Sequence, residues 1–158
     1  MKVGITGHQK RKGIKWSWVS AALRIELAKV QGIQGAFSSL AEGSDQIFAR
    51  VALQLGIPVN VVIPVANYER YFNDKTLAEY RRLLKLCSRI QLHSSTDPEK
   101  AFFEAGKFIV DRSNILFAVW DGQEAEGLGG TADIVTYAHS INRSIVHLDP
   151  LKQTVRVI

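Results

Sequence analysis

The sequence has 158 residues, of which 46% are hydrophobic and 22% are charged. The length predicts a single domain over residues 1–158, and the composition excludes an intrinsically disordered chain. The formal net charge of +5 is compatible with an anionic ligand or a nucleic acid but requires neither.

Short apolar runs alternate with amphipathic helical segments along the chain. In chain order, the expected elements are a strand at 2–6, a helix at 16–31, a strand at 34–40, a helix at 44–56, a strand at 58–65, a polar Tyr-rich loop at 66–75, a helix at 76–86, a strand at 89–93, a helix from 97, a strand at 114–120, a helix from 131, a strand at 144–148 and a short edge strand at 154–158. This alternation predicts an α/β fold with a Rossmann-like, doubly wound, mainly parallel sheet and helices on both faces.

Cysteine content and hydropathy exclude further classes of protein. The single cysteine, Cys87, excludes an internal disulfide and a multi-cysteine zinc site. The longest uninterrupted apolar stretch, residues 115–120, is far shorter than the roughly 20 residues that span a bilayer. The N-terminus also lacks the apolar segment of a secretory signal. We therefore expect a cytoplasmic domain without membrane contact, metal site or cofactor.

The loop after the first strand is the first candidate ligand-binding segment, because ligands bind beyond the carboxyl ends of the strands in such sheets. Thr6, Gly7 and His8 begin this loop, and the basic residues 10–12 follow. The segment has neither the dinucleotide-binding G-x-G-x-x-G fingerprint nor the Walker lysine motif. Its glycines would let the backbone approach a ligand, whereas a lone loop histidine is more often exposed or locally bonded.

The loop after the second strand offers Glu42, Gly43 and Ser44 at the start of a helix. Small residues and backbone N–H groups at such a helix start form a cradle for phosphate or ribose. Alternatively, the segment is a plain strand–turn–helix connection with Ser44 as the N-cap. Its spacing does not separate the two interpretations.

The loop after the fifth strand begins at Asp121 and ends in Gly129, Gly130 and Thr131 at the start of the last main helix. Paired glycines at a helix start suit an anion, and the Thr131 hydroxyl adds a donor and an N-cap. Asp133 lies in the first helical turn. There it either complements the helix dipole, or binds ribose or acts as a general acid or base.

Charge is unevenly distributed along the chain. Residues 1–25 carry six basic and no acidic side chains, and residues 121–133 carry four acidic and no basic ones. The basic segment 10–15, with Trp18 and the aromatic residues of 68–72 as stacking partners, makes single-stranded nucleic-acid binding an alternative function.

Two of these loops resemble motifs of known families. The segment Phe-Ser-Ser-Leu-Ala-Glu-Gly-Ser-Asp at residues 37–45 is similar to the S-G-x-A-x-G-x-D stretch of the DNA-processing protein A (Smf) family. The Gly129-Gly130-Thr131 turn resembles the P-G-G-x-G-T-x-x-E motif of the LOG nucleoside-monophosphate phosphoribohydrolases. Both families have a Rossmann-like architecture and together form the SLOG superfamily. The resemblance covers about residues 2–149.

The resemblance implies a pocket that binds a nucleotide or a nucleotide-derived small molecule between the glycine-rich loops. LOG enzymes cleave the N-glycosidic bond of a nucleoside monophosphate, and Smf-type members bind single-stranded DNA. Other members are ligand sensors, some of them in bacterial conflict systems. Related domains often self-associate, so a homodimer is a further alternative.

The sequence departs from the LOG motif at the position of its glutamate, which is Ile134 here, and Asp133 is the nearest carboxylate. For the arginine that LOG enzymes use, the helix before the fifth strand offers Lys107 and Arg112. If the protein is an N-glycosidic hydrolase, the resemblance makes Asp133 and Arg112 its catalytic candidates. Because backbone N–H groups do not depend on that carboxylate, we predict nucleotide binding, with hydrolysis and single-stranded DNA binding as the alternatives.

Overall fold

The computed structural model describes residues 1–93, 97–124 and 128–158 of the chain. Its strands, in chain order, are β1 (Lys2–Gly7), β2 (Gly35–Ser38), β3 (Val59–Ile63), β4 (Ser88–Gln91), β5 (Ile115–Val119), β6 (Ser144–Asp149) and β7 (Thr154–Val157). Its helices are α1 (Trp16–Lys29), α2 (Ser44–Gln54), the short 3₁₀ helix η1 (Tyr68–Tyr71), α3 (Asp74–Leu84), α4 (Pro98–Arg112) and α5 (Thr131–Ser140). No helix in these described ranges combines the length and the apolar character needed to cross a bilayer.

The described strands form one sheet in the order β4-β3-β2-β1-β5-β6-β7. Neighbouring strands are parallel except for β6 and β7, which are antiparallel. From β1 the chain builds outward through β2, β3 and β4, and then returns to place β5 on the other side of β1. The strand order therefore reverses at β1, and sheets of this kind bind ligands beyond the carboxyl ends of the strands at this reversal.

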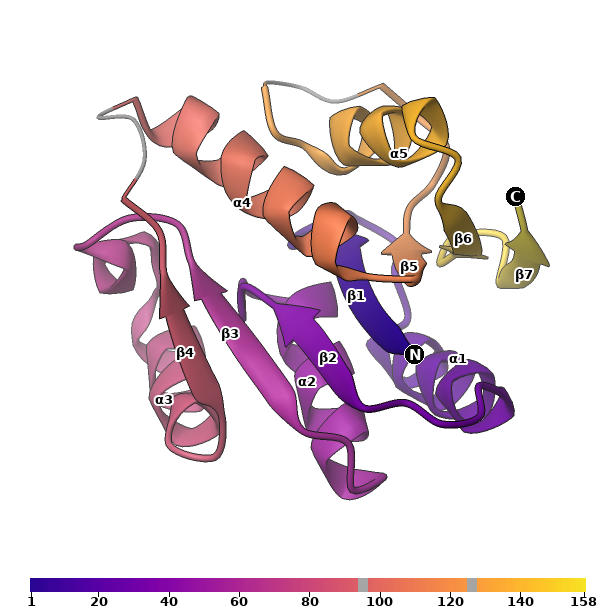
Figure 1. The fold of residues 1–158 in the computed structure, drawn as a ribbon, viewed down its shortest axis with the longest axis horizontal. Coiled ribbons are helices and arrows are strands. Elements are labelled where there is room, and N and C mark those ends of the chain that lie inside the picture. Colours follow the sequence, from indigo (N-terminus) through magenta and orange to yellow (C-terminus); the bar gives the residue numbers. More distant parts are fainter. Residues whose placement is uncertain (94–96, 125–127) are drawn as a thin grey trace.

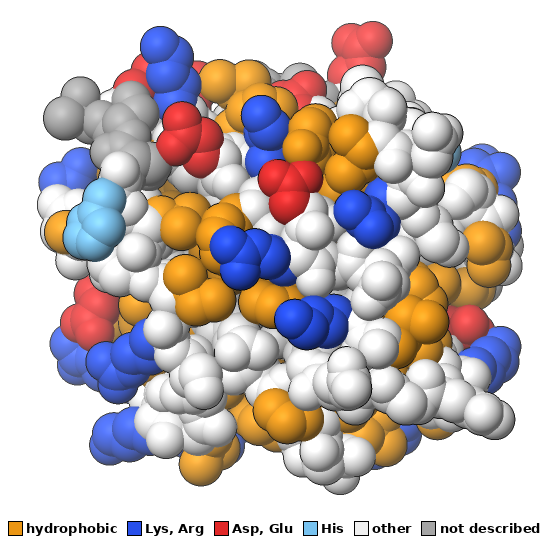
Figure 2. Space-filling view, viewed as in Figure 1, with side chains coloured by type: hydrophobic (Ala, Val, Ile, Leu, Met, Phe, Trp, Pro, Cys, Tyr) orange, Lys and Arg blue, Asp and Glu red, His pale blue; other side chains and the backbone are white. Residues whose placement is uncertain are grey.

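Helices cover both faces of the sheet, with α1, α2 and α3 on one face and α4 and α5 on the other (Figure 1). Alternate residues of β5 belong to different cores. Phe117 and Val119 pack in the core with α1, α2 and α3, whereas Leu116 and Ala118 pack in the core with α4 and α5. Because both faces of β5 are buried, its sequence is an uninterrupted apolar run. Figure 2 shows the face that carries α4 and α5, where patches of hydrophobic side chains lie between Lys and Arg side chains.

The predicted fold class is confirmed, and the predicted strands and helices are present with ends that lie within two residues of the predicted ones. Asp97 caps α4 and Pro98 is its first residue, as predicted. The helix predicted from residue 76 begins earlier, because Asn73 and Thr76 form a capping box. In this box the Asn73 side chain accepts the Thr76 N–H at 2.9 Å, and the Thr76 hydroxyl accepts the Asn73 N–H at 3.1 Å.

Candidate functional site

A cleft of about 620 Å³ opens at the carboxyl edge of the sheet, where the strand order reverses. Residues that follow β1, β2, β3 and β5 line it, together with residues 102–109 of α4 on one side of that helix and the start of α5. Of the residues predicted from the sequence, the cleft brings together Thr6, Gly7, His8, Glu42, Gly129, Gly130 and Thr131. Gly43, Ser44 and Asp121 do not line the cleft but contact or adjoin residues that do.

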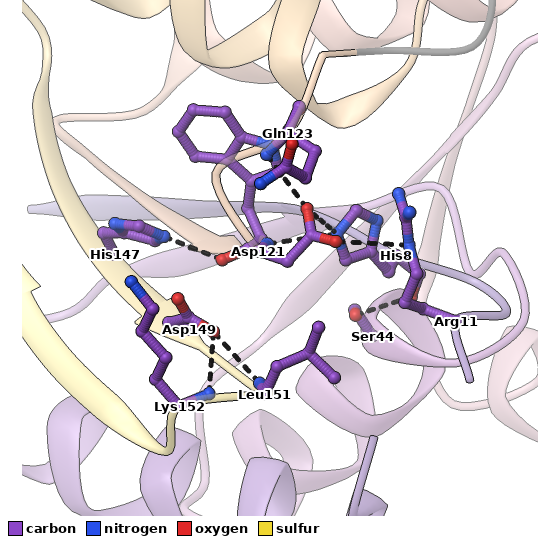
Figure 3. Close-up of polar contacts among 10 residues, drawn as sticks. His8, Arg11, Ser44, Asp121, Gln123, His147, Asp149, Leu151 and Lys152 are labelled. Atoms are coloured by element: carbon purple, nitrogen blue, oxygen red, sulfur yellow. Dashed lines mark hydrogen bonds and ion pairs between the residues drawn. The ribbon is translucent and has the colours of Figure 1, made fainter. Parts of the chain in front are cut away.

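His8 connects the loops around the carboxyl end of β1 (Figure 3). Its N–H donates to the Val119 carbonyl at 3.0 Å, and its own carbonyl accepts the Ser44 N–H and hydroxyl at 3.2 and 2.7 Å. Its ring atom Nε2 accepts the Asp121 N–H at 3.1 Å. Burial lowers the pKa of His8 although the Asp121 carboxylate opposes this shift. The neutral ring therefore holds the loops together as an acceptor, while His8 also lines the cleft.

Asp121 fixes the loop after β5 to the loop after β1. Its Oδ1 atom accepts the Gln123 N–H at 3.1 Å, and Arg11 Nε lies 3.4 Å from its Oδ2 atom. Burial alone would raise the pKa of Asp121, but the hydrogen bond from the Gln123 N–H and the nearby His8 and Arg11 side chains outweigh burial and lower it. The carboxylate is thus engaged within the protein, and it does not line the cleft.

At the start of α2, the N–H groups of the first and third helical residues already have acceptors. The Ser44 N–H donates to the His8 carbonyl, and the Gln46 N–H donates to the Ala41 carbonyl, both at 3.2 Å. The prediction that Ser44 is the N-cap is wrong, because Ser44 is the first helical residue and Gly43 is the N-cap. The Ser44 hydroxyl instead donates to the loop after β1. This helix start therefore does not offer the predicted phosphate cradle.

Two glycines at this place allow close packing of the backbone. At Gly43, where φ is +82°, an added Cβ atom would lie 2.6 Å from the Gln9 carbonyl oxygen. At Gly7, it would lie 2.6 Å from Ser44 Cβ and 2.9 Å from Val119 Cβ. All three distances are shorter than real Cβ contacts, so a side chain at either glycine would push the loop after β1 away from α2.

The start of α5 differs, because the N–H groups of its first two residues have no acceptor among the described residues. Gly130 is the N-cap and makes no side-chain cap bond, so the prediction that Thr131 caps the helix is wrong. Thr131 and Ala132 line the cleft, and within the described part of the chain their N–H groups have no acceptor. Asp133 accepts the Gly129 N–H at 3.1 Å and thereby holds the turn before the helix.

Aromatic side chains form one wall of the cleft. Tyr68 and Tyr71 come from η1, and Phe102 comes from α4. The rings of Tyr71 and Phe102 meet edge to face with centroids 5.1 Å apart, and Tyr71 is 42% exposed. The predicted aromatic group at 68–72 thus reaches the cleft, whereas Trp18 packs against the core.

Basic side chains of the loop after β1 line another part of the cleft. Lys10 Nζ lies 3.4 Å from Glu42, and Arg11 pairs with Asp121. Lys12 is exposed at the cleft and has no ion-pair partner among the described residues. Lys12 is therefore available to an anionic ligand.

The two catalytic candidates taken from the LOG resemblance do not line the cleft. Arg112 lies in the last turn of α4, with its guanidinium 4.4 Å from the centre of the Phe108 ring. Because β5 begins three residues after Arg112, the last turn of α4 lies toward the edge of the sheet at which β5 starts, opposite the carboxyl edge. The Asp133 carboxylate is engaged with Gly129.

One acidic side chain at the cleft is missing from the sequence prediction. Asp45, in the first turn of α2, lines the cleft with only 8% of its surface exposed. Burial raises its pKa to about 7, against the opposing effect of hydrogen bonds from the Ala41 and Ser39 backbones. The resemblance of residues 37–45 to the S-G-x-A-x-G-x-D stretch ends at Asp45 and could have marked it. An acid in a first helical turn is, however, already explained by the helix dipole.

No family model and no curated protein matches the sequence. Among solved structures, the chain is similar to DNA processing protein A from Streptococcus pneumoniae, with a TM-score of 0.66 and 17% identity over 94% of this chain and 50% of that one. It is also similar to TM1055, a structural genomics target, with a TM-score of 0.60 and 14% identity over 93% of this chain and 73% of that one. The chain thus spans about half the length of DNA processing protein A. These likenesses show the fold alone, which is the predicted Rossmann-like fold with a doubly wound, mainly parallel sheet.

Proposed function

We propose that the cleft binds a nucleotide or a nucleotide-derived small molecule. The observation that carries this proposal is the pairing of two surfaces in one cleft, the open N–H groups at the start of α5 and the aromatic wall. Backbone N–H groups at a helix start favour phosphate, because they donate hydrogen bonds at the positive end of the helix dipole. Aromatic rings favour a nucleobase, because every base has a face that stacks.

Each part of the ligand has a matching set of residues. The phosphate lies against the Thr131 and Ala132 N–H groups, and Lys12 contributes positive charge. Glu42 accepts hydrogen bonds from ribose hydroxyls, and Thr6, Gly7 and His8 flank the sugar and phosphate. The base stacks at Tyr71 and Phe102. The names of the structural neighbours agree with a nucleic-acid-related role, since one of them is a DNA processing protein.

Single-stranded nucleic acid is the second candidate ligand, and a second hollow favours it. This hollow of about 610 Å³ shares residues 10–12 and Glu42 with the cleft and extends between the starts of α2 and α3. Its basic lining residues are Lys10, Arg11, Lys12, Arg50 and Lys75. Oligonucleotide binding along this path would weaken steeply with salt, because each phosphate contact releases counterions. N-glycosidic hydrolysis has less support, since Asp133 and Arg112 do not line the cleft.

The test removes one backbone donor from the start of α5. Thr131→Pro deletes the N–H of the first helical residue, where proline is tolerated, and the extended backbone of Gly130 (φ −67°, ψ 170°) suits a following proline. We expect calorimetric titration to show that wild type binds a nucleoside monophosphate or diphosphate. The variant should bind that nucleotide about tenfold more weakly or worse, because a charge-assisted hydrogen bond is lost. The matching nucleoside should bind both proteins alike.

Two variants control for other effects of the proline. Asp74→Pro places proline at the first position of α3, outside the cleft, and should leave nucleotide affinity unchanged. Thr131→Ala keeps the N–H and removes only the hydroxyl. Absence of nucleotide binding by wild type, or equal affinities of wild type and Thr131→Pro, would overturn the proposal.

A further inference from the structure

Asp45 lies where the aromatic wall meets the end of β2. Its side chain is at the cleft surface, and one of its oxygens accepts the Ala41 N–H at 3.4 Å. Its own carbonyl accepts the Ser38 hydroxyl at 3.1 Å, which fixes the first turn of α2 against the strand end. The carboxyl is therefore held in one place by the backbone around it.

No cation of the described chain compensates the charge of Asp45. The neighbouring acids are paired, Glu42 with Lys10 and Asp121 with Arg11, each at 3.4 Å. Within the described residues, no Lys, Arg or His forms an ion pair with Asp45. A buried carboxylate without such a partner is costly, and hydrogen-bond donors from a ligand would offset that cost.

The groups around the Asp45 carboxylate favour its role as a hydrogen-bond acceptor. The protein groups that reach the carboxyl, the Ala41 and Ser39 N–H groups, are both donors. They favour the ionised form, although burial is the larger effect and raises the pKa to about 7. An ionised carboxylate only accepts hydrogen bonds, so its remaining lone pairs match a ligand edge that carries donors.

The aromatic wall of the cleft lies beside Asp45. Tyr68 lies close to Asp45, since burial raises the pKa of Tyr68 and the Asp45 charge raises it further. The Tyr68 ring contacts the Tyr71 and Phe102 rings, with centroid distances of 6.4 and 6.3 Å. Tyr68, Tyr71 and Phe102 line the same cleft as Asp45.

We propose that Asp45 determines which base the cleft accepts, and that it selects guanine by accepting hydrogen bonds from the ring N–H and the exocyclic amino group. Guanine carries these two donors side by side, which matches an acceptor-only carboxylate. Hypoxanthine has the same ring N–H but lacks the amino group. Adenine places its amino group beside a ring nitrogen that is itself an acceptor. This inference rests on the proposed nucleotide-binding function and specifies its ligand.

The test compares bases that differ by single groups. Wild type, Asp45→Asn and the control Asp74→Asn are titrated calorimetrically with GMP, IMP and AMP at pH 8. Asp74 is also in the first turn of a helix but is exposed and outside the cleft. We expect wild type and the control to bind GMP at least about tenfold more tightly than IMP or AMP, because a hydrogen bond to a charged group is lost with either analogue. Asp45→Asn should bind all three nucleotides with similar, weaker affinity.

The outcomes separate this inference from the proposed function. If none of the nucleotides binds wild type, the proposed function fails and this inference fails with it. If nucleotides bind but wild type does not distinguish GMP from IMP, or prefers AMP, the assignment of guanine is overturned while the proposed function stands. A GMP preference that persists in Asp45→Asn assigns base recognition to another residue. The comparison of GMP with IMP on wild type needs no variant, so a folding defect of Asp45→Asn leaves the test decisive.

Discussion

The starts of α2 and α5 both follow glycine-containing turns at the same edge of the sheet, yet their N–H groups meet different surroundings. At α2, the N–H groups of Ser44 and Gln46 donate to carbonyls of neighbouring loops. At α5, the N–H groups of Thr131 and Ala132 have no acceptor in the described chain, and both residues line the cleft. The two helix starts share glycine at the N-cap, a hydroxyl residue at the first position and an aspartate in the first turn.

The path of the chain after β1 explains the difference. Because α1 packs beside α2 on one face of the sheet, the chain that leaves β1 toward α1 contacts the start of α2, where the His8 carbonyl accepts the Ser44 N–H. The carbonyls of His8 and Gln9 lie within 3 Å of where a Gly43 Cβ atom would be. At the turn before α5 the close neighbour is helix α4, since an added Cβ atom at Gly129 would lie 2.8 Å from the Phe103 nitrogen. This neighbour does not accept the Thr131 or Ala132 N–H groups within the described chain. A glycine-rich helix start is therefore open to a ligand only where its N–H groups are not already bonded to the carbonyls of another loop.

The largest effect is expected from adding a side chain at the N-cap of α2, where the loop after β1 packs against the helix start. Gly43→Ala combines a φ of +82° with a Cβ atom 2.6 Å from the Gln9 carbonyl oxygen. We expect the free energy of unfolding to fall by about 4 kcal/mol, because backbone strain and overpacking add. Chemical denaturation monitored by circular dichroism measures the loss.

Gly32→Ala separates the two causes of that loss. Gly32 also has a positive φ, +68°, but an added Cβ atom there meets nothing within 4 Å. We expect Gly32→Ala to lower the free energy of unfolding by about 1 kcal/mol, from backbone strain alone. Equal losses for the two variants would contradict close packing at the start of α2.

The first-turn aspartate of α2 should make the stability of the protein depend on pH. Burial raises the pKa of Asp45 to about 7, above its ordinary value, so the folded state keeps a proton that the unfolded state releases in this range. The contribution of Asp45 to stability is therefore present at low pH and is lost as the pH rises toward and through 7. From pH 5 to pH 8, we expect wild type to lose about 3 kcal/mol of unfolding free energy relative to Asp45→Asn.

The difference between wild type and the variant isolates Asp45 from groups that act in the opposite direction. His8 has a lowered pKa, so its contribution to stability rises with pH. Denaturation curves of both proteins at pH 5, 6, 7 and 8 share that contribution. Parallel pH profiles for the two proteins would show that Asp45 titrates normally in the folded state.

The sequence predicts the architecture well, because that depends on periodic patterns. Continuous apolar runs such as residues 115–119 indicate strands buried on both faces, and helices with a regular stripe such as Val19, Leu23 and Leu27 are amphipathic. The position of the cleft also follows from the order of strands and helices, since ligand loops follow the carboxyl ends of parallel strands.

The sequence could not predict in the same way which side chains near the cleft bond within the protein and which line the cleft. Whether Ser44 caps a helix or donates to His8 depends on a contact across 36 residues of sequence. The burial of Asp45 depends on how η1 and the end of β2 surround it, and the removal of Arg112 from the cleft depends on the length of α4. These are properties of packing between distant segments, for which local sequence patterns carry no signal.

The smallest effects on stability and affinity are expected from removing one hydroxyl group at the first residue of α2 or of α5. These two variants compare the helix starts directly, because the same group is removed from each. Ser44→Ala removes the buried hydroxyl that donates to the His8 carbonyl at 2.7 Å, while the Ser44 N–H bond to that carbonyl remains. We expect a loss of about 1 kcal/mol in unfolding free energy and no change in nucleotide affinity.

Thr131→Ala removes a hydroxyl that has no partner in the described chain and lines the cleft. Its stability should stay within about 0.5 kcal/mol of wild type, while nucleotide affinity falls about threefold as one donor to phosphate is lost. Thermal denaturation and calorimetric titration of both variants measure the two quantities side by side. A loss of nucleotide affinity in Ser44→Ala, or a loss of stability without a loss of affinity in Thr131→Ala, would contradict the comparison. It would show that the start of α2 does not serve packing alone, or that the start of α5 does not serve binding. The contact of the loop after β1 with α2 would then not decide which helix start is free to bind.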